Sequence, residues 1–228
     1  MPPWQVVNVR FVLSFSGGKD SILALHQMVE DGHEPVALLV MFRKEAERSW
    51  VHGLDPLLLS SISDALHIPL LCCNAMGETY EKDMERSLLR AKDMGAEACV
   101  FGDIDIEEHR CWDEMRCAAV GLKAVLPLWQ RNREENARLA VNLGYRCLVK
   151  CIQSSILPET ILGHPLTLAM LKELKLRGID LCGENGEYHT VVVDGPLFRH
   201  PVHIKCRGIL RLAHISAADL VVQKNNLS

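Results

Sequence analysis

The chain reads Ser16-Gly17-Gly18-Lys19-Asp20-Ser21 at the point where an apolar run, residues 9–15, gives way to a helical pattern of apolar residues. A strand that turns through two glycines into a helix N-terminus directs several backbone N–H groups at one spot, and the helix dipole favours an anion there. Lys19 adds a positive charge, and two serine hydroxyls add donors. The alternative is a glycine turn that caps an ordinary helix. The flanking residues favour a polyphosphate-binding loop.

The spacing in this loop differs from the Walker A pattern, in which four residues separate the first glycine from the Gly-Lys pair. Here the glycines are adjacent and an aspartate follows Lys19. The string instead resembles the Ser-Gly-Gly-x-Asp-Ser loop of the ATP pyrophosphatases. That resemblance implies cleavage of ATP between its alpha and beta phosphates, with transfer of AMP to a substrate oxygen.

The first half of the chain alternates between apolar runs of strand length and amphipathic helical patterns. Near-continuous apolar strands between helices predict an α/β fold, a parallel twisted sheet with helices on both faces. Ligands of such sheets bind beyond the carboxyl ends of the strands. That edge should collect residues 16–21, the segment after residue 42, and Gly102-Asp103. The strands are expected at 9–15, 35–42, 68–73 and 98–102, and the helices at 20–31, 54–66, 78–94 and 106–120.

Residues 43–53 form a polar segment near the same expected edge. It carries Arg43, Lys44 and Arg48 and ends in His52-Gly53. Two interpretations stand, a solvated loop and a flap over a bound nucleotide.

The pattern changes near Pro127, where a polar stretch follows. We expect a boundary there, with a domain at 1–127 that binds ATP and a smaller α+β domain at 128–228 that binds the acceptor. In the second domain the expected helices are 133–142 and 166–177, and the expected strands are 146–152, 190–193, 202–207 and 220–223.

The composition is that of an ordinary globular protein, with 228 residues, 48% hydrophobic and 24% charged. No apolar run reaches the length of a membrane span, and the N-terminus lacks the layout of a secretory signal. We therefore expect a cytoplasmic protein that does not bind membranes. The net charge of -4 favours no binding of bulk nucleic acid. A homo-oligomer is compatible with the sequence.

Nine cysteines occur without a Cys-x-x-Cys pair, so a zinc site is not indicated. Most lie inside apolar segments and are expected to be reduced, buried residues. The buried ones in strands should be Cys72, Cys73, Cys99, Cys147 and Cys151.

A second unusual string runs Gly183-Glu184-Asn185-Gly186-Glu187-Tyr188-His189-Thr190, directly before a β-branched run. An Asn-Gly hairpin turn explains its centre. It does not explain a carboxylate on each side or the polar residues that enter the strand. The composition favours a substrate-binding site.

The two strings together resemble the diphthine–ammonia ligase (diphthamide synthase) family of ATP pyrophosphatases, whose second motif is Gly-Glu-x-Gly-Glu-[Tyr/Phe]-x-Thr. The resemblance spans most of the chain. Shorter family pieces also match, namely His52-Gly53, residues 101–104, His109-Arg110 and residues 127–129. The known ligases commonly have glycine and glutamate where this chain has Asn185 and His189.

The resemblance implies an adenine nucleotide alpha hydrolase-like domain and an AMP-forming amidation of diphthine on elongation factor two by ammonium. The acceptor here is either a modified protein side chain or a small carboxylate. Residues 16–21 would bind the pyrophosphate portion of ATP, with Lys19 neutralising its charge. Glu184 and Glu187 would bind the acceptor or ammonium and accept a proton, and the other residues of 183–190 would help to bind the acceptor.

Further nucleotide contacts are expected from Leu39 and Met41 near the adenine, and from His52, Gly53 and Gly102. Asp20 and Asp103 would hold Mg²⁺ on the phosphates. A helix cap for Asp20 and a loop cap for Asp103 are the plain alternatives.

Two other functions would share the ATP loop. A tRNA-modifying pyrophosphatase would need a basic surface and often paired cysteines, and the acidic net charge and the missing Cys-x-x-Cys weigh against it. A nucleotide-binding protein without catalysis would have no use for a second, carboxylate-rich site.

Overall fold

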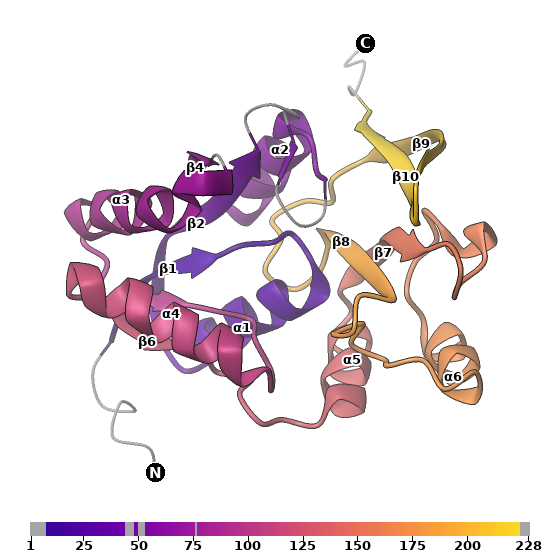
Figure 1. Ribbon diagram of the computed structural model, residues 1–228, viewed down its shortest axis with the longest axis horizontal. Coiled ribbons are helices and arrows are strands. Elements are labelled where there is room, and N and C mark those ends of the chain that lie inside the picture. Colours follow the sequence, from indigo (N-terminus) through magenta and orange to yellow (C-terminus); the bar gives the residue numbers. More distant parts are fainter. Residues whose placement is uncertain (1–7, 44–47, 50–52, 76, 224–228) are drawn as a thin grey trace. The chain divides into compact units, whose positions relative to one another are not determined.

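The structure is a computed structural model and describes residues 8–43, 48–49, 53–75 and 77–223 (Figure 1). The described residues divide into two units. The first contains those in Met1–Ser16, Asp20–Pro56 and Ile68–Arg131. The second contains Gly17–Lys19, Leu57–His67 and those in Asn132–Ser228.

The first unit is built on a parallel sheet, which confirms the predicted α/β class. Strand β1 (Arg10–Ser14) is central and pairs with β2 (Glu34–Arg43) on one side and β5 (Ala98–Val100) on the other. Next to β2 lies β4 (Leu70–Ala75), and next to β5 lies β6 (Lys123–Val125). The carboxyl ends of these strands therefore share one edge.

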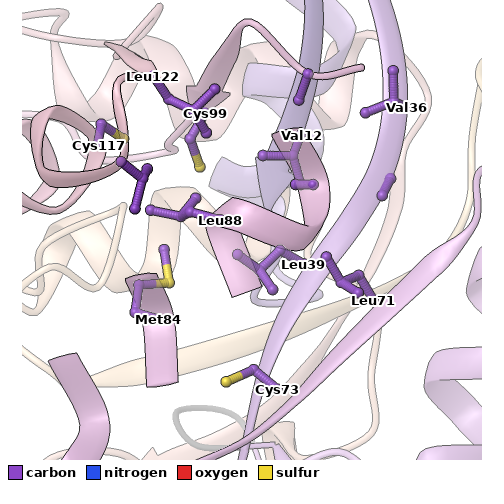
Figure 2. Packing of buried hydrophobic residues seen from close by; sticks show 14 of the residues in the cluster. Val12, Val36, Leu39, Leu71, Cys73, Met84, Leu88, Cys99, Cys117 and Leu122 are labelled. Carbon is purple, nitrogen blue, oxygen red and sulfur yellow. The ribbon is translucent and has the colours of Figure 1, made fainter. Parts of the chain in front are cut away.

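Alternation along the strands divides the core of this unit between the two faces of the sheet. On one face Val12, Leu39 and Leu71 pack in a cluster with α3 (Tyr80–Asp93) and α4 (Glu107–Val120), as Figure 2 shows. Phe11 and Leu13 point to the other face and are fully buried. That face is covered by α1 (Lys19–Glu30), the helix that follows β1.

The cysteine predictions are only partly correct. Cys73 and Cys99 belong to the buried cluster, and Cys147 is buried in the second unit. Cys151 is half-buried, and Cys72 is exposed because β4 turns Cys73 inward and its neighbour to the opposite face. All nine cysteines fall within the described part of the chain, and all are free thiols.

Two short elements were not expected. The two-residue strand β3 (Arg48–Ser49) runs antiparallel to the end of β2. The helix predicted from residue 78 starts as a short 3₁₀ turn, η2 (Gly77–Thr79), before α3 begins. Strand β6 was also missed, because its three residues include a lysine and are too few to show a period.

The second unit contains an antiparallel sheet in the order β8-β7-β10-β9. Helix α5 (Arg133–Asn142) matches its predicted bounds, because Asn132 caps it by accepting from the Glu135 N–H at 3.1 Å. The remaining elements are α2 (Pro56–Leu66), η3 (Glu159–Ile161), α6 (Leu168–Leu176), β7 (Arg146–Gln153), β8 (Tyr188–Asp194), β9 (Ile204–Leu212) and β10 (Ile215–Val222).

Helix α2 lies between β2 and β4 in the sequence but falls in the second unit from Leu57 onward. Its Ala65 carbonyl accepts from the Arg199 N–H at 2.8 Å. Strands β9 and β10 are longer than predicted and form a hairpin around Ala213. Most of β9 is exposed, so the apolar pattern that marks a buried strand covers only part of it. Among the described residues, no helix has both the length and the apolar character that crossing a bilayer requires.

Candidate functional site

The predicted polyphosphate loop lies where β1 passes into α1. Phe15 is buried, Gly17 has a φ of 83°, and α1 begins at Lys19 with Asp20 in its first turn. A non-glycine residue at position 17 would be strained by that φ, so the glycine is required by the turn itself. Ser16 Oγ donates to Ser21 Oγ at 3.2 Å across the loop. The strand–turn–helix geometry of an anion-binding loop is present in the structure.

Gly102 brings the end of the β5 segment directly against this loop. A Cβ atom at position 102 would lie 2.9 Å from the backbone carbon of Asp20 and 2.9 Å from the nitrogen of Ser21. Real Cβ contacts are almost never that short, and backbone atoms cannot rotate away. The missing side chain at Gly102 therefore sets how closely Asp103 approaches α1.

Asp103 faces two charged neighbours. Its Oδ1 lies 3.0 Å from His109 Nδ1 in the first turn of α4. Burial raises the pKa of Asp103, His109 opposes that rise, and the carboxylate of Asp20 adds to it. The carboxylate of Asp20, the other residue predicted to hold Mg²⁺, thus lies close enough to act on Asp103.

The short family-like pieces meet at the same place. The guanidinium of Arg110 lies 5.0 Å from the centre of the Trp129 ring. The Gln130 N–H donates to the Ile104 carbonyl at 2.6 Å, which fixes the segment after β6 beside Gly102-Asp103. The sequence indicated no role for His109, Arg110 or Trp129. The structure places His109 against Asp103 and Arg110 against Trp129.

Asp113 is a buried carboxyl group on α4 that the sequence did not single out. It is 4% exposed, and its Oδ2 has no hydrogen-bond partner among the described residues. Burial and, next, the charge of Asp103 raise the pKa of Asp113 to about 9. Asp113 is therefore a neutral acid at pH 7, so it adds no negative charge to those of Asp20 and Asp103.

The residues expected near adenine lie on β2, where the Leu39 carbonyl accepts from the Phe15 N–H at 2.8 Å, directly before the loop. Leu39 is 1% exposed within the buried cluster, and Met41 packs against that cluster. Gly53 is half-buried with a φ of 59°. His52 and Lys44 fall outside the described residues, as does most of the segment predicted to form a flap. An adenine contact from these residues stays a prediction.

The second motif forms a tight loop in the second unit that is organised by two carboxylates. Asp180 Oδ1 accepts from the Cys182 N–H at 3.0 Å, and Asp180 Oδ2 accepts from the Glu184 N–H at 3.0 Å. Glu187 Oε1 accepts from the Asp180 N–H at 3.4 Å and from Asn185 Nδ2 at 3.2 Å. A turn is present, since the Gly186 N–H donates to the Gly183 carbonyl at 3.0 Å, but no strand directly precedes it, so the expected Asn185-Gly186 hairpin is not formed. The turn also positions a carboxylate.

Gly183 and Tyr188 close the base of this loop. Gly183 has a φ of 71°, and a Cβ there would lie 2.5 Å from the Tyr188 carbonyl oxygen. The hydroxyl of Tyr188 donates to the Leu181 carbonyl, and its side chain is 1% exposed. Tyr188 is thus a buried support of the loop. His189 and Glu184 are half-buried, and Asn185 and Gly186 are exposed.

Residues 17–19 of the phosphate loop contact the second motif within the second unit. The Lys19 N–H donates to Thr190 Oγ1 at 3.0 Å, and the Val192 N–H donates to the Gly17 carbonyl at 2.8 Å. Lys19 Nζ donates to the Cys182 carbonyl and lies 5.6 Å from the centre of the Tyr188 ring. Thr190 satisfies an N–H at the start of α1 that the helix itself leaves open.

Arg133 and Asp180 are functional-site residues that sequence reasoning missed. Arg133 forms an ion pair with Asp180 at 2.6 Å, and its carbonyl accepts from Cys182 Sγ at 2.9 Å. The only signal in the sequence was an aspartate three residues before Gly183. The partner arginine lies 47 residues earlier, so no local pattern could have indicated it.

Asn136 follows Arg133 by three residues on α5 and is fully buried, and neither atom of its amide has a hydrogen-bond partner among the described residues. The buried amide gives up its hydrogen bonds to water on folding, and no hydrogen bond within the described parts of the protein replaces them. We therefore expect Asn136→Leu to raise the free energy of unfolding by about 1 kcal/mol. Urea unfolding measures this. Asn142→Leu, at the exposed end of α5, serves as the control and should change it by less than about 0.5 kcal/mol. A loss of stability in Asn136→Leu would contradict this account.

Known proteins resemble this chain along nearly its whole length. The family model described as diphthamide synthase N-terminal domain matches residues 9–124, and the one described as diphthamide synthase C-terminal domain matches residues 132–221. The chain is 28% identical over 222 residues to the diphthine–ammonia ligase of Danio rerio, covering 86% of each protein. The human diphthine–ammonia ligase is 25% identical over 220 residues, which is 85% of this chain and 82% of that protein.

Two further comparisons differ in kind. The diphthine–ammonia ligase of Saccharomyces cerevisiae is 26% identical over 234 residues, but the match covers only 34% of that longer protein. A crystal structure described as a predicted subunit of tRNA methyltransferase from Methanocaldococcus jannaschii aligns with a TM-score of 0.44 and 14% identity, covering 85% of this chain and all of that one. Such a score is too low to support an inference about activity.

Proposed function

The chain belongs to the diphthamide synthase family, and from this premise we propose that it is an AMP-forming ligase that adenylates an acceptor carboxylate and amidates it with ammonia. Diphthine is the acceptor in the named reaction of its relatives. The observation that carries the proposal is the direct contact of the two motifs, in which Lys19 bonds both Thr190 and the Cys182 carbonyl. Lys19 of the proposed ATP loop thus contacts two residues of the carboxylate-rich segment.

The chemistry explains why ATP is needed. A carboxylate is a poor acyl donor because its oxygen is a strongly basic leaving group. When that oxygen attacks the alpha phosphate, pyrophosphate leaves and an acyl adenylate forms. Ammonia then attacks the carbonyl carbon, the bond from that carbon to the AMP oxygen breaks, and AMP leaves with the electron pair. The ammonium ion gives up two protons in all, so the products are the amide, AMP and pyrophosphate.

The phosphate loop supplies binding and charge stabilisation. The N–H groups at the start of α1 and the hydroxyls of Ser16 and Ser21 bind the outer phosphates, whose negative charge grows as pyrophosphate departs. The Lys19 side chain contributes positive charge at the same helix end. Lys19 Nζ also donates to the Cys182 carbonyl, so the same residue contacts the second motif within the second unit.

Mg²⁺ is a proposed part of this site. No cluster of three or more His, Cys, Asp or Glu side chains suited to a metal occurs in the described part of the chain. Magnesium on a nucleotide, however, needs only one or two protein carboxylates, because the phosphates and water supply the rest. Asp20 and Asp103 fit this need, since the Asp20 carboxylate lies close enough to raise the pKa of Asp103. When bound, the ion would neutralise phosphate charge.

The second motif binds the acceptor and the amine. Glu184 and Glu187 bind the acceptor or ammonium and accept protons, and His189 lies beside them in β8. Asn185 and His189 stand where the known ligases commonly have glycine and glutamate, so the acceptor is either diphthine or another carboxylate. A cytoplasmic location and self-association stay predictions from the sequence.

Product analysis tests the proposed function. The protein is incubated with ATP, Mg²⁺, ammonium and elongation factor two that carries diphthine, and the nucleotides are separated. AMP and pyrophosphate should form together with an amide whose nitrogen comes from added ¹⁵N-ammonium. Reactions without acceptor and with Asp20→Ala are the controls. Formation of ADP, or of AMP without an amide on any carboxylate tested, would contradict the assignment.

A further inference from the structure

Resting on the proposed function, we propose that the two glutamates of the second motif have different tasks, with Glu187 Oε2 binding the ammonium ion and Glu184 left to the acceptor. The sequence could not divide these roles. Both glutamates lie in one loop, and the residues that follow them, Asn185 and Tyr188, do not indicate which glutamate has which role. The division comes from the different surroundings of the two carboxylates.

Glu187 is held in a fixed orientation and is 7% exposed. Its Oε1 is occupied by two local donors, the Asp180 N–H and the Asn185 side chain. Its Oε2 is buried and has no hydrogen-bond partner among the described residues. One oxygen therefore anchors the carboxylate, and the other is buried without a hydrogen-bond partner among the described residues. Glu184, in contrast, is half-buried.

The nearby cationic side chains are committed elsewhere. Arg133 pairs with Asp180 at 2.6 Å. Lys19 Nζ donates to the Cys182 carbonyl and lies over the Tyr188 ring. Neither donates a hydrogen bond to Glu187 Oε2 within the described parts of the chain. A buried carboxylate oxygen left without a partner is strongly unfavourable, so the site is complete only when a cation arrives.

Hydrogen bonding at Oε2 favours one kind of cation. Ammonium carries four N–H donors, and a charge-assisted N–H···O bond to a fixed oxygen is strong and directional. The bound ion must lose a proton before its nitrogen can attack, and Oε2 is the base in contact with it.

Asn185 makes the surroundings of Glu187 in this chain differ from those in the known ligases. Where the known ligases commonly have glycine, Asn185 Nδ2 donates to Glu187 Oε1 at 3.2 Å. A glycine could not make this bond. Asn185 is thus a positioning residue, and Asn185→Gly should weaken ammonium binding less than the loss of the Glu187 charge does.

Ammonium binding can be measured without turnover. Titration of the unreacted protein into ¹⁵N-ammonium chloride should broaden the ammonium resonance, and Glu187→Gln should remove that broadening. Glutamine keeps the shape and the acceptor at Oε1 but replaces the charged oxygen with a donor. Glu173→Gln, an exposed site on α6, is the matched control and should behave as wild type. Equal broadening in wild type and Glu187→Gln would overturn the assignment.

Kinetics give a second, independent readout. In Glu187→Gln the KM for ammonium should rise about tenfold or more, since one charged hydrogen bond is lost. Hydroxylamine is largely uncharged at pH 8 and needs no cation site, so its KM and the rate of ATP–pyrophosphate exchange should change less than about threefold. An equal loss with both amines would also overturn the assignment. If wild type forms no amide but only Glu187→Gln loses the broadening, the cation site stands and the proposed ligase activity fails.

Discussion

Gly102→Ala should lower the rate of ATP–pyrophosphate exchange about a hundredfold. The added Cβ would meet the backbone of Asp20 and Ser21 at 2.9 Å, and neither atom can move without displacing the start of α1. A shift of about 1 Å in groups that hold a reacting phosphate can lower the reaction rate about a hundredfold. Overpacking of this kind should also lower the free energy of unfolding by about 1–3 kcal/mol. Isotope exchange and urea unfolding measure the two effects.

Gly32→Ala is the control for this experiment. Gly32 follows the other end of α1, has a φ of 84°, and has open space around its Cα. Alanine there should lower the free energy of unfolding by about 1 kcal/mol through backbone strain but leave exchange intact. If Gly102→Ala retained wild-type exchange, the loop at residues 16–21 would not be the phosphate site.

Asp113→Asn should become progressively more stable than wild type as the pH rises from 5 to 8. The pKa of Asp113 is about 9 in the folded protein and near 3.8 in the unfolded chain. Between these values the folded chain keeps a proton that unfolding releases, so the Asp113 carboxyl group lowers the free energy of unfolding as the pH rises. The slope is about 1.4 kcal/mol per pH unit, which gives an upper limit of about 4 kcal/mol over three units.

Because asparagine does not titrate, the difference between the two proteins isolates this one group. Urea unfolding at several pH values measures it, and Asp93→Asn, at an exposed site on α3, is the control. A difference that does not change between pH 5 and 8 would mean that the Asp113 carboxylate is charged at neutral pH. Its burial would then need a partner that the described residues do not provide.

The sheet of the first unit and the phosphate loop could be predicted because their signals are local. Apolar runs of four to eight residues mark the buried strands of a parallel sheet, and Gly17 is required by a turn that involves only its neighbours. The same reasoning failed where the pattern was short or incomplete. Strand β6 has three residues, and β9 exposes most of its side chains.

The membership of the site was predicted only in part. Gly102 and Asp103 were expected beside the loop, because strands of a parallel sheet share a carboxyl edge. Asp113 and Asn136 gave no signal, since one polar residue in an amphipathic helix is ordinarily exposed. Only the packing of α4 and α5 shows that both side chains are buried. Among the residues described, each also has at least one polar atom without a hydrogen-bond partner.

Short-range order along the chain was therefore enough to predict a strand–turn–helix loop, an α/β sheet and a carboxylate-rich turn, because each depends on residues within a few positions of one another. The contacts that give these parts a joint function span far greater separations. Lys19 and Thr190 are 171 residues apart, and Arg133 and Asp180 are 47 apart. No periodicity or spacing encodes such pairs, since they arise only when distant segments bury their surfaces together. Folding alone decided that Glu187 keeps one carboxylate oxygen for a ligand.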